Sequence, residues 1–448
     1  MKDNRNKPSS MSPSFDSQSP PSPELIDACV HCGFCLATCP SYRVIGKETD
    51  SPRGRIYLMD GINRSEIDLS PTVVGHFDTC LGCLACVTAC PSGVQYDRLI
   101  SATRAQVERN HPRSLLDQLL RQFIFRVFPY PDRLRLLLFP LWFYQKFGLQ
   151  GLMDRLGLSQ LLPDRLGAME SLLPPLDQSS FTDNLPPVVP AQGEKRYRVG
   201  VITGCVQRVF LPKVNEATVD VLAANGCEVV IPSGQGCCGA LSAHQGQEEQ
   251  ARDLARATID RFFDLQLDYV IINAAGCGHI LKEYGHLLKD DDKYRDKAQA
   301  FVKQVKDIHE FLAEVGITAR LHPIGDRPLT VVYQDACHLL HGQKISLQPR
   351  RLLKQIPGLV LKEIMDSALC CGSAGIYNIL QPSVADELGT QKVHNLLAPQ
   401  PDLIASPNVG CALQIRKHLA LQKRDVPVLH PIELLQRSIG MGYDGRKS

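Results

Sequence analysis

CVHCGFCLATCP at residues 29–40 and CLGCLACVTACP at residues 80–91 are two copies of one pattern, C-x2-C-x2-C-x3-C-P, at a constant offset of 51 residues. Thiols at this spacing wrap one corner of a cubane [4Fe–4S] cluster, and the fourth cysteine, which precedes the proline, ligates the neighbouring cluster. The pattern therefore predicts two [4Fe–4S] clusters held by crossed sets: Cys29, Cys32 and Cys35 with Cys90, and Cys80, Cys83 and Cys86 with Cys39.

The surroundings of the two motifs predict a mainly helical dicluster ferredoxin domain over residues 24–105. Gly33 and Gly82 lie inside the loops, where the missing Cβ lets backbone N–H groups approach the sulfurs. The 40 residues between the motifs exceed the short connection of a compact bacterial ferredoxin, and Ser51 followed by Pro52 favours a helix start. Structural zinc is the alternative for four thiolates, but it usually takes two separated C-x2-C pairs.

A second group of cysteines recurs as an internal repeat. Its members are Cys205, Cys237, Cys238 and Cys277 in the first copy and Cys337, Cys370, Cys371 and Cys411 in the second, at offsets of 132–134 residues. Each element follows a strand-like run or lies in a loop before a helix, and loops at the carboxyl ends of parallel strands converge. Strand-like and helix-like stretches alternate, which predicts two duplicated α/β Cys-Cys-Gly units with parallel strands, at residues 195–325 and 326–440.

Four thiolates in each copy match the ligand demand of one further iron–sulfur cluster, so both copies are candidate cluster sites. Gly239 and Gly372, which follow the cysteine pairs, would allow close approach of the backbone. The alternative is that these cysteines are structural and pack as small core residues. We assign that core role to Cys227, which lies outside both patterns.

The remaining segments carry no cysteine. Residues 1–22 are polar and rich in serine and proline, which predicts a disordered tail. Residues 106–194 are expected to form a helical segment and a Pro-rich linker, with the apolar run LLLFPLWFY at residues 136–144. We expect Pro129, Pro131 and Pro140 to break this region into short helices. Packing between the cysteine regions, docking of a partner subunit and contact with a membrane surface are the roles open to it.

Composition excludes several classes of protein. The 49 Lys and Arg residues nearly balance the 47 Asp and Glu residues. The chain therefore has no strong net positive charge that would attract nucleic acid. No run is long and apolar enough to cross a bilayer, and residues 1–22 lack a secretory pattern, so we expect a cytoplasmic protein. Seventeen cysteines in a reducing compartment favour metal ligation over disulfides.

No flavin or nicotinamide site is expected on this chain. Gly234, Gly236 and Gly239 spell G-x-G-x-x-G, but this stretch overlaps the cysteine pair, and the next strand-like run ends at Asn273 instead of an acidic residue. We also find no set of Arg and Tyr residues that we could assign to a substrate carboxylate. An oxidoreductase built on this chain therefore needs flavin on a partner subunit.

The two ferredoxin-type motifs, followed by repeats with GCCG at residues 236–239 and LCCG at residues 369–372, resemble the iron–sulfur subunit of glycolate oxidase over about residues 24–440. The resemblance implies an electron-transfer subunit of a flavin-dependent glycolate dehydrogenase complex, which converts glycolate to glyoxylate, with D-lactate a second substrate in the same family. It implies FAD on partner subunits only, and a quinone or another acceptor reached by peripheral contact with the cytoplasmic face of a membrane.

Two other families share parts of this pattern. The iron–sulfur subunit of anaerobic glycerol-3-phosphate dehydrogenase has the same architecture, and the Cys-Cys-Gly repeats resemble those of heterodisulfide reductase. In the latter pattern each repeat ends in C-x-x-C and holds a noncubane cluster, whereas the matching positions here are Ile280 and Gln414, with His279 a candidate substitute ligand. Two alternatives to an electron relay remain. One is a thiol–disulfide enzyme of that kind, and the other is a protein-interaction module whose cysteines bind structural zinc.

Overall fold

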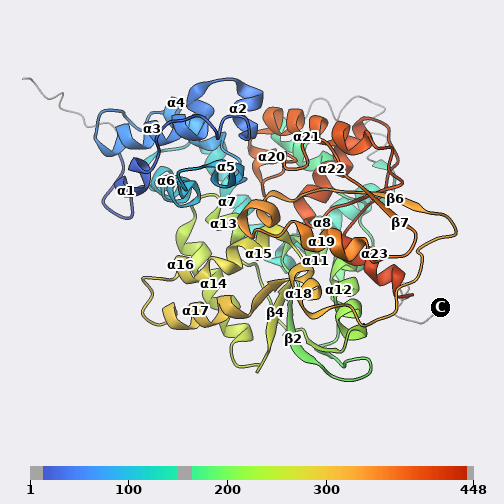
Figure 1. Cartoon of the computed structure of the whole chain (residues 1–448). Helices are drawn as coiled ribbons and strands as arrows, with labels where there is room; N and C mark the ends of the chain where they lie inside the picture. Colours follow the sequence, from blue (N-terminus) through green and yellow to red (C-terminus); the bar gives the residue numbers. More distant parts are fainter. Residues whose placement is uncertain (1–13, 150–163, 441–448) are drawn as a thin grey trace, which may run out of the picture. The chain divides into compact units, whose positions relative to one another are not determined.

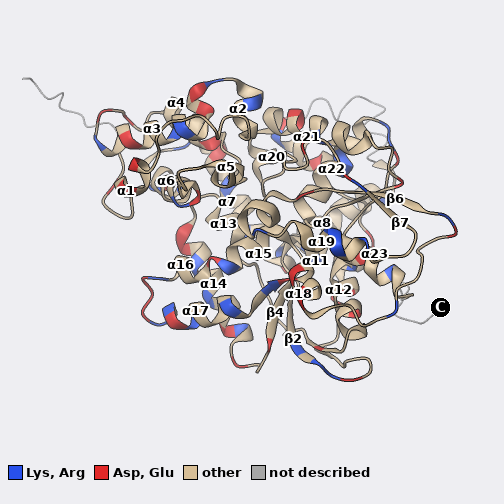
Figure 2. Ribbon diagram, in the orientation of Figure 1, with Lys and Arg blue, Asp and Glu red and all other residues tan. Residues whose placement is uncertain are grey.

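The structure, a computed structural model, describes residues 14–149 and 164–440 and divides the chain into two compact units (Figure 1). Unit 1 contains the chain up to Leu119 together with Ala243–Glu248, and unit 2 contains Leu120–Ser242 and the chain from Glu249 onward. Basic and acidic residues are interspersed along the ribbons (Figure 2), in keeping with the formal net charge of +2. The ferredoxin-type motifs and the Cys-Cys-Gly repeats therefore belong to different units.

Unit 1 is built from short helices wherever the structure describes it. These are α1 (Pro23–Asp27), α2 (Pro40–Ile45), η1 (Glu48–Asp50), α3 (Pro52–Asn63), α4 (Pro71–Asp78), α5 (Ala85–Ala89) and α6 (Tyr96–Asn110). Several begin with proline after a serine cap, as in α3, where Ser51 Oγ accepts a hydrogen bond from Gly54 N–H at 3.0 Å. Met59, Phe77 and Leu99 are buried in the core between the helices. The predicted helical ferredoxin-type domain is confirmed.

Part of the predicted N-terminal tail is attached to α6. The Asp16 carboxylate accepts hydrogen bonds from Arg109 Nε and from Asn110 Nδ2, both at 2.9 Å, and the Asp16 N–H donates to Gln106 Oε1 at 2.7 Å. Residues 14–22 are therefore not a free tail, because Asp16 finds hydrogen-bond partners on three α6 residues. Residues 1–13 lie outside the described residues.

Unit 2 contains two sheets of the same topology. The first has β1 (Val188–Val189), β2 (Tyr197–Ile202), β3 (Cys227–Val230), β4 (Tyr269–Ile272) and β5 (Val305–Asp307) in the order β1-β3-β2-β4-β5. The second has β6 (Leu329–Tyr333), β7 (Leu359–Lys362), β8 (Leu403–Ala405) and β9 (Val428–Leu429) in the order β7-β6-β8-β9. Neighbouring strands are parallel except β1, which runs antiparallel to β3. The matching orders confirm two duplicated α/β units.

The helices of unit 2 repeat as the strands do. The first repeat has α11 (Val206–Phe210), α12 (Pro212–Ala224), α13 (Ala240–Ala243), α14 (Glu248–Phe262), α15 (Ala275–Lys282), α16 (Tyr284–Leu287), α17 (Arg295–Gln304) and α18 (Ile308–Val315). The second has the short turn η4 (His338–Gly342), α19 (Leu347–Leu353), α20 (Tyr377–Leu380), α21 (Pro382–Leu397), α22 (Val409–Leu421) and α23 (Pro431–Ser438).

Two symmetric helix contacts join the repeats. Helix α12 packs against α23, and α18 packs against α19. Because α12 follows β2 and α19 follows the matching strand β6, while α18 follows β5 and α23 follows the matching strand β9, these contacts are two halves of one pseudo-twofold arrangement. One hydrophobic core runs through both repeats and includes the buried residues Val201, Phe311, Val331 and Leu434.

The cysteine-free segment forms α7 (Leu115–Val127), α8 (Pro131–Lys146), α10 (Asp164–Ser171) and η3 (Gln178–Phe181), and the Pro-rich run after it ends in β1. Helix α8 continues through Pro140, so the expectation that prolines break this region into short pieces is wrong there. Pro140 has no N–H group, so the Leu136 carbonyl four residues earlier loses the hydrogen bond that another residue would have given it. No helix within residues 14–149 and 164–440 combines the length and apolar character that crossing a bilayer requires.

The inner faces of this segment pack on unit 2. Phe125 of α7 lies in a cluster with Ile376 and Ile379, and Leu138 of α8 lies in a cluster with Val209. The inner side of the segment therefore packs within unit 2.

Candidate metal centres

The second ferredoxin-type motif surrounds a cavity in unit 1. Cys39, at the N-cap of α2, lines this cavity together with Cys80, Cys83 and Cys86 from the loop before α5 and its first turn. These four thiols are one of the predicted crossed sets, and the fold brings them together from both motifs. No three Cys, His, Asp or Glu side chains among the described residues are close enough to hold a single metal ion. A cubane cluster is larger than one ion and takes its thiolates at four separate corners, so the set fits a cluster better.

Each motif also places a glycine in the left-handed region against an arginine. Gly33 has a φ of +88°, and a Cβ there would lie 2.9 Å from Arg53 Nη1; Gly82 has a φ of +63°, and its Cβ would lie 3.1 Å from Arg104 Nη1. The Gly82 N–H donates a hydrogen bond to Cys80 Sγ at 3.4 Å. A backbone N–H directed at the sulfur fits a thiolate that carries part of a cluster's negative charge.

The first motif is more accessible to solvent than the second. Cys32 is exposed, whereas Cys29, Cys35 and Cys90 are half-buried and pack against the hydrophobic core of unit 1. Burial raises the pKa of Cys35, and it raises the pKa of the fully buried Cys86 well above its usual value, with neighbouring thiols adding to the effect. A bound metal deprotonates such thiols outright.

In unit 2 the four cysteines of the first repeat form one contiguous group. Cys205 follows β2, Cys237 and Cys238 follow β3, and Cys277 lies in α15 after β4, so they come from the carboxyl ends of three adjacent strands. The Cys237 side chain interacts with those of Cys205 and Cys238, and Cys238 interacts with Cys277. The pKa of Cys205 is raised by the neighbouring Cys237 thiol and by burial.

The second repeat assembles its cysteines in the same way. Cys337 follows β6, Cys370 and Cys371 follow β7, and Cys411 lies in α22 after β8. Cys370 interacts with Cys337 and Cys371, and Cys371 interacts with Cys411. The Cys370 and Cys411 thiols hold the pKa of Cys371 well below its usual value, with Lys392 also contributing. Cys370, Cys371 and Cys411 are buried and Cys337 is half-buried, and four thiols gathered in this way are suitable for an iron–sulfur cluster.

The cysteine loops of the two repeats face one interface within unit 2. Gln343 Nε2 donates to the Ala275 carbonyl at 3.0 Å, and the Gly276 N–H donates to Asn408 Oδ1 at 3.3 Å. The ring of His279, the candidate substitute ligand, packs against His338 of the other repeat at a centroid distance of 5.0 Å.

The positions that match the last cysteine of the heterodisulfide reductase repeat carry no thiol here. Ile280 is buried, and Gln414 is buried with its amide donating to the Ala385 carbonyl at 3.1 Å and accepting from Asn378 Nδ2 at 2.9 Å. Cys227 lies in the core of the first sheet, as predicted, and burial raises its pKa to about 12.

Sequence reasoning missed three buried polar residues beside the cysteines. Arg55 is fully buried and lines the cavity of unit 1. Lys392 is fully buried, with Nζ donating to the Ser367 carbonyl at 2.6 Å, and the Tyr284 hydroxyl donates to the Cys238 carbonyl at 2.7 Å. A charged residue on an otherwise apolar helix face, as Lys392 is between Leu388 and Leu396, was the available signal.

Three protein families match separate parts of the chain. The family described as "4Fe-4S dicluster domain" matches residues 25–94, and the family described as "Cysteine-rich domain" matches residues 199–282 and 331–416. The family described as "Glycolate oxidase iron-sulfur subunit, linker region" matches residues 116–173. The chain is thus an iron–sulfur electron-transfer protein of the oxidoreductase class.

Curated relatives extend over nearly the whole chain. A probable glycolate oxidase iron-sulfur subunit of Bacillus subtilis is 38% identical and the glycolate oxidase iron-sulfur subunit of Escherichia coli is 35% identical, each alignment covering 93% of this chain and 94% of the relative. Lactate utilization protein A of Exiguobacterium is 26% identical over 54% of this chain and 98% of its own length. The chain belongs to the family of glycolate oxidase iron–sulfur subunits.

Proposed function

We propose that the chain relays single electrons from FAD-binding partner subunits to a quinone or another acceptor while the complex oxidises glycolate to glyoxylate. The observation that carries this proposal is the cavity where the fold delivers Cys39 of the first motif to three cysteines of the second. A [4Fe–4S] cluster accepts and releases one electron at a time, so it can take the electron pair of a reduced flavin in two steps.

The cavity lined by Cys39, Cys80, Cys83 and Cys86 supports the crossed ligand sets. We assign one [4Fe–4S] cluster to Cys39, Cys80, Cys83 and Cys86, and the other to Cys29, Cys32, Cys35 and Cys90. Cys32 is exposed, so the second of these sets is the natural point of electron exchange with a docked partner. The groups in unit 2 are candidates for further clusters: Cys205, Cys237, Cys238 and Cys277, and Cys337, Cys370, Cys371 and Cys411.

The relatives support the assignment of substrate. Glycolate is named in two relatives that cover 93% of the chain, and lactate is named in a relative that covers 54% of it. We therefore place glycolate first and D-lactate second as substrates of the complex, with the flavin and the substrate site on its partners.

The test is the native complex, purified with its partners and assayed for substrate-dependent dye reduction. Glycolate should support reduction by the complex, and the isolated chain should be inactive with glycolate, D-lactate and glycerol-3-phosphate. Activity of the complex with glycerol-3-phosphate alone, or direct disulfide reduction by the isolated chain, would contradict the proposal and favour one of the related families.

The outer face of α8 supports a peripheral membrane contact on the cytoplasmic side. Four exposed apolar residues recur at spacings of three or four along this face: Leu136, Phe139, Phe143 and Phe147. Two basic side chains of α8 lie over aromatic rings. Arg133 lies 4.1 Å from the ring centroid of Tyr130, and Lys146 lies 4.6 Å from the ring centroid of Trp142. Aromatic rings at headgroup depth with cations beside them complement an anionic lipid surface.

The double variant Leu136→Ser with Phe147→Ser should lose vesicle binding. Both side chains are highly exposed, at 77% and 69%, so the fold should not change. Because burying one such side chain contributes about 1.5–3 kcal/mol, binding to anionic vesicles should fall at least tenfold in a flotation assay. Met365→Ser, which is 81% exposed elsewhere in unit 2, is the control and should bind as wild type does. Equal binding of all three proteins, or release of the flavoprotein instead, would refute the lipid contact.

A further inference from the structure

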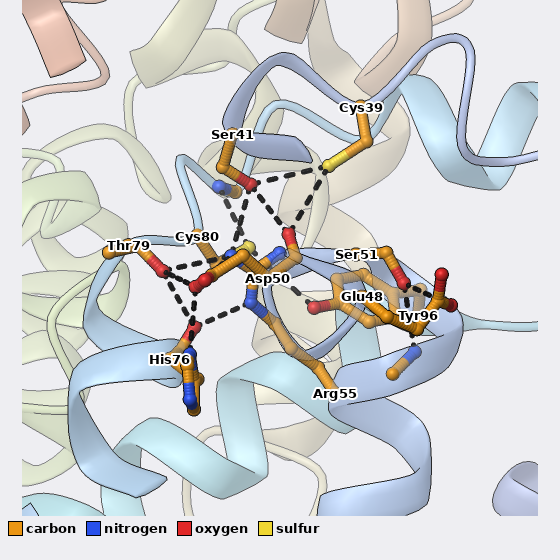
Figure 3. Close-up of polar contacts among 12 residues, drawn as sticks. Cys39, Ser41, Glu48, Asp50, Ser51, Arg55, His76, Thr79, Cys80 and Tyr96 are labelled. Carbon is orange, nitrogen blue, oxygen red and sulfur yellow. Dashed lines mark hydrogen bonds and ion pairs between the residues drawn. The ribbon is translucent and has the colours of Figure 1, made fainter. Parts of the chain in front are cut away.

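Arg55 is a fully buried cation in unit 1 whose hydrogen bonds go to neutral oxygens (Figure 3). Its Nε donates to the His76 carbonyl at 2.6 Å, and its Nη2 donates to Ser41 Oγ and Thr79 Oγ1, each at 3.0 Å. Asp50 Oδ1 lies 3.6 Å from Nη2, which is too long for a hydrogen bond. That oxygen instead accepts from Thr79 Oγ1 at 2.6 Å and lies 3.0 Å from His76 Nδ1. The guanidinium therefore forms a buried ion pair with Asp50, at a longer distance than its hydrogen bonds to the neutral oxygens.

The same guanidinium borders the cavity of the four thiols. Arg55 lines it with Cys39, Cys80 and Tyr96. Ser41 Oγ, which accepts from Arg55, lies 3.3 Å from Cys39 Sγ, and the Tyr96 hydroxyl donates to Cys80 Sγ at 3.7 Å (Figure 3). The guanidinium is therefore linked through Ser41 to Cys39 and lines the same cavity as Cys80.

Comparison of the two copies of the ferredoxin-type motif shows that only one cluster site has a buried arginine and a tyrosine hydroxyl of this kind. Arg53 and Arg104 occupy matching positions at the offset of 51, and each lies against the glycine of its motif. At the position that matches Arg55 the chain has Gln106, which is fully buried and whose side-chain Nε2 donates to Asp16 Oδ1 at 3.0 Å. The residue that matches Tyr96 in the first copy, 51 positions earlier, is Ile45, whose side chain has no hydroxyl group.

This difference matters because reduction adds one negative charge to a cluster. In the buried set that charge enters a low-dielectric interior, where a nearby fixed cation interacts with it far more strongly than in water. Net charge, hydrogen bonds to the sulfurs and exposure to solvent are the factors that set cluster potentials. A buried cation on one side of the pseudo-repeat therefore separates the potentials of the two clusters.

We propose that Arg55 is a positioning residue that raises the reduction potential of the cluster assigned to Cys39, Cys80, Cys83 and Cys86. The exposed set, with Cys32, would hold the cluster that takes an electron from the reduced flavin of the partner, and the buried set would hold the cluster that accepts this electron next, with no bond formed or broken. Ser41 and Thr79 hold the guanidinium in place. The inference rests on the ligand assignment of the proposed function.

The test is a redox titration of the anaerobic full-length chain followed by electron paramagnetic resonance. In Arg55→Gln, one ferredoxin-type signal should move to lower potential by at least a tenfold change in its reduced-to-oxidised ratio, which is about 59 mV for one electron. The other signal should keep its potential. Arg55→Lys, which retains the charge, should recover most of the shift. Tyr96→Phe should shift the same signal by less in the same direction, and it decides the matter if Arg55→Gln does not fold.

Arg113→Gln is the matched control. Arg113 is a largely buried arginine of unit 1 paired with Asp78 at 2.8 Å and Glu108 at 2.7 Å, and it does not line the thiol cavity. Its loss should leave both potentials unchanged. Unchanged potentials in Arg55→Gln and Tyr96→Phe, or an equal shift in Arg113→Gln, would overturn the inference while the clusters themselves remain. Absence of iron from the wild-type chain would overturn the proposed function as well, and metal analysis separates the two outcomes.

Discussion

The Cys83→Ser variant is expected to lose about four iron and four sulfide per chain, which is the content of one cubane cluster. Cys83 is buried in the loop before α5 and lines the cavity with three other thiols. Because cluster binding is coupled to folding, the loss should also destabilise unit 1. Unit 2 should stay folded, since it has its own core. Iron and sulfide analysis with limited proteolysis measures both effects.

Cys227→Ala is the control for this loss of a buried thiol. Cys227 is fully buried in β3 and belongs to neither cysteine pattern. Its removal should lower the stability of unit 2 and leave the iron content at the wild-type value. Wild-type iron content in Cys83→Ser, or iron loss in Cys227→Ala, would contradict the ligand assignment.

The Gly372→Ala variant is expected to destabilise unit 2 by at least about 2 kcal/mol, since an alanine is strained in the left-handed region and its methyl group has no space. Gly372 has a φ of +86°, and a Cβ there would lie 2.5 Å from the Ala385 carbonyl oxygen. The clash would separate α21 from the loop that carries Cys370 and Cys371. Thermal unfolding followed by the fluorescence of Trp142, the single tryptophan of the chain, reports on unit 2.

Two other glycines calibrate this result. Gly239 is the matching residue of the first repeat and has a φ of +84°. A Cβ there would lie 3.1 Å from the Ala251 carbonyl oxygen, so Gly239→Ala should destabilise unit 2 by less than Gly372→Ala does. Gly236 has open space around its Cβ position and no left-handed backbone, so Gly236→Ala should change stability by less than about 0.5 kcal/mol. Equal stability of all three variants would show that the loops adapt and that the close approach is not required.

The sequence predicted the fold best where the spacing of cysteines along the chain is specific to iron–sulfur ligation. The C-x2-C-x2-C-x3-C-P motifs and the repeated Cys-Cys-Gly elements were sufficient to predict the helical ferredoxin-type domain and the duplicated parallel sheets. The short strands β1, β5 and β9 were not predicted, because two or three residues carry too little periodicity and are extended only through pairing with a neighbouring strand. The continuous helix through Pro140 was missed because tertiary packing of Leu134 and Leu138 outweighs local propensity.

The candidate sites show the same limit. Spacing alone predicts which thiols form a group, and the structure brings Cys39 to the second motif. What surrounds the thiols depends on contacts that are distant in sequence, such as Arg55 with the carbonyl of His76. The motif pattern carries no information about these contacts, which explains why Arg55 and Lys392 were absent from the predicted sites.

The most direct measurement of the central claim is the iron and acid-labile sulfide content of the anaerobically purified chain, combined with electron paramagnetic resonance of its complex after addition of glycolate. The account predicts at least about eight iron and eight sulfide per chain, four of each for every cubane, and cluster signals that appear with glycolate only when the flavoprotein subunits are present. Stoichiometric zinc in place of iron, an iron content after reconstitution that falls short of two cubanes, or clusters that glycolate leaves oxidised in the complete complex would contradict it.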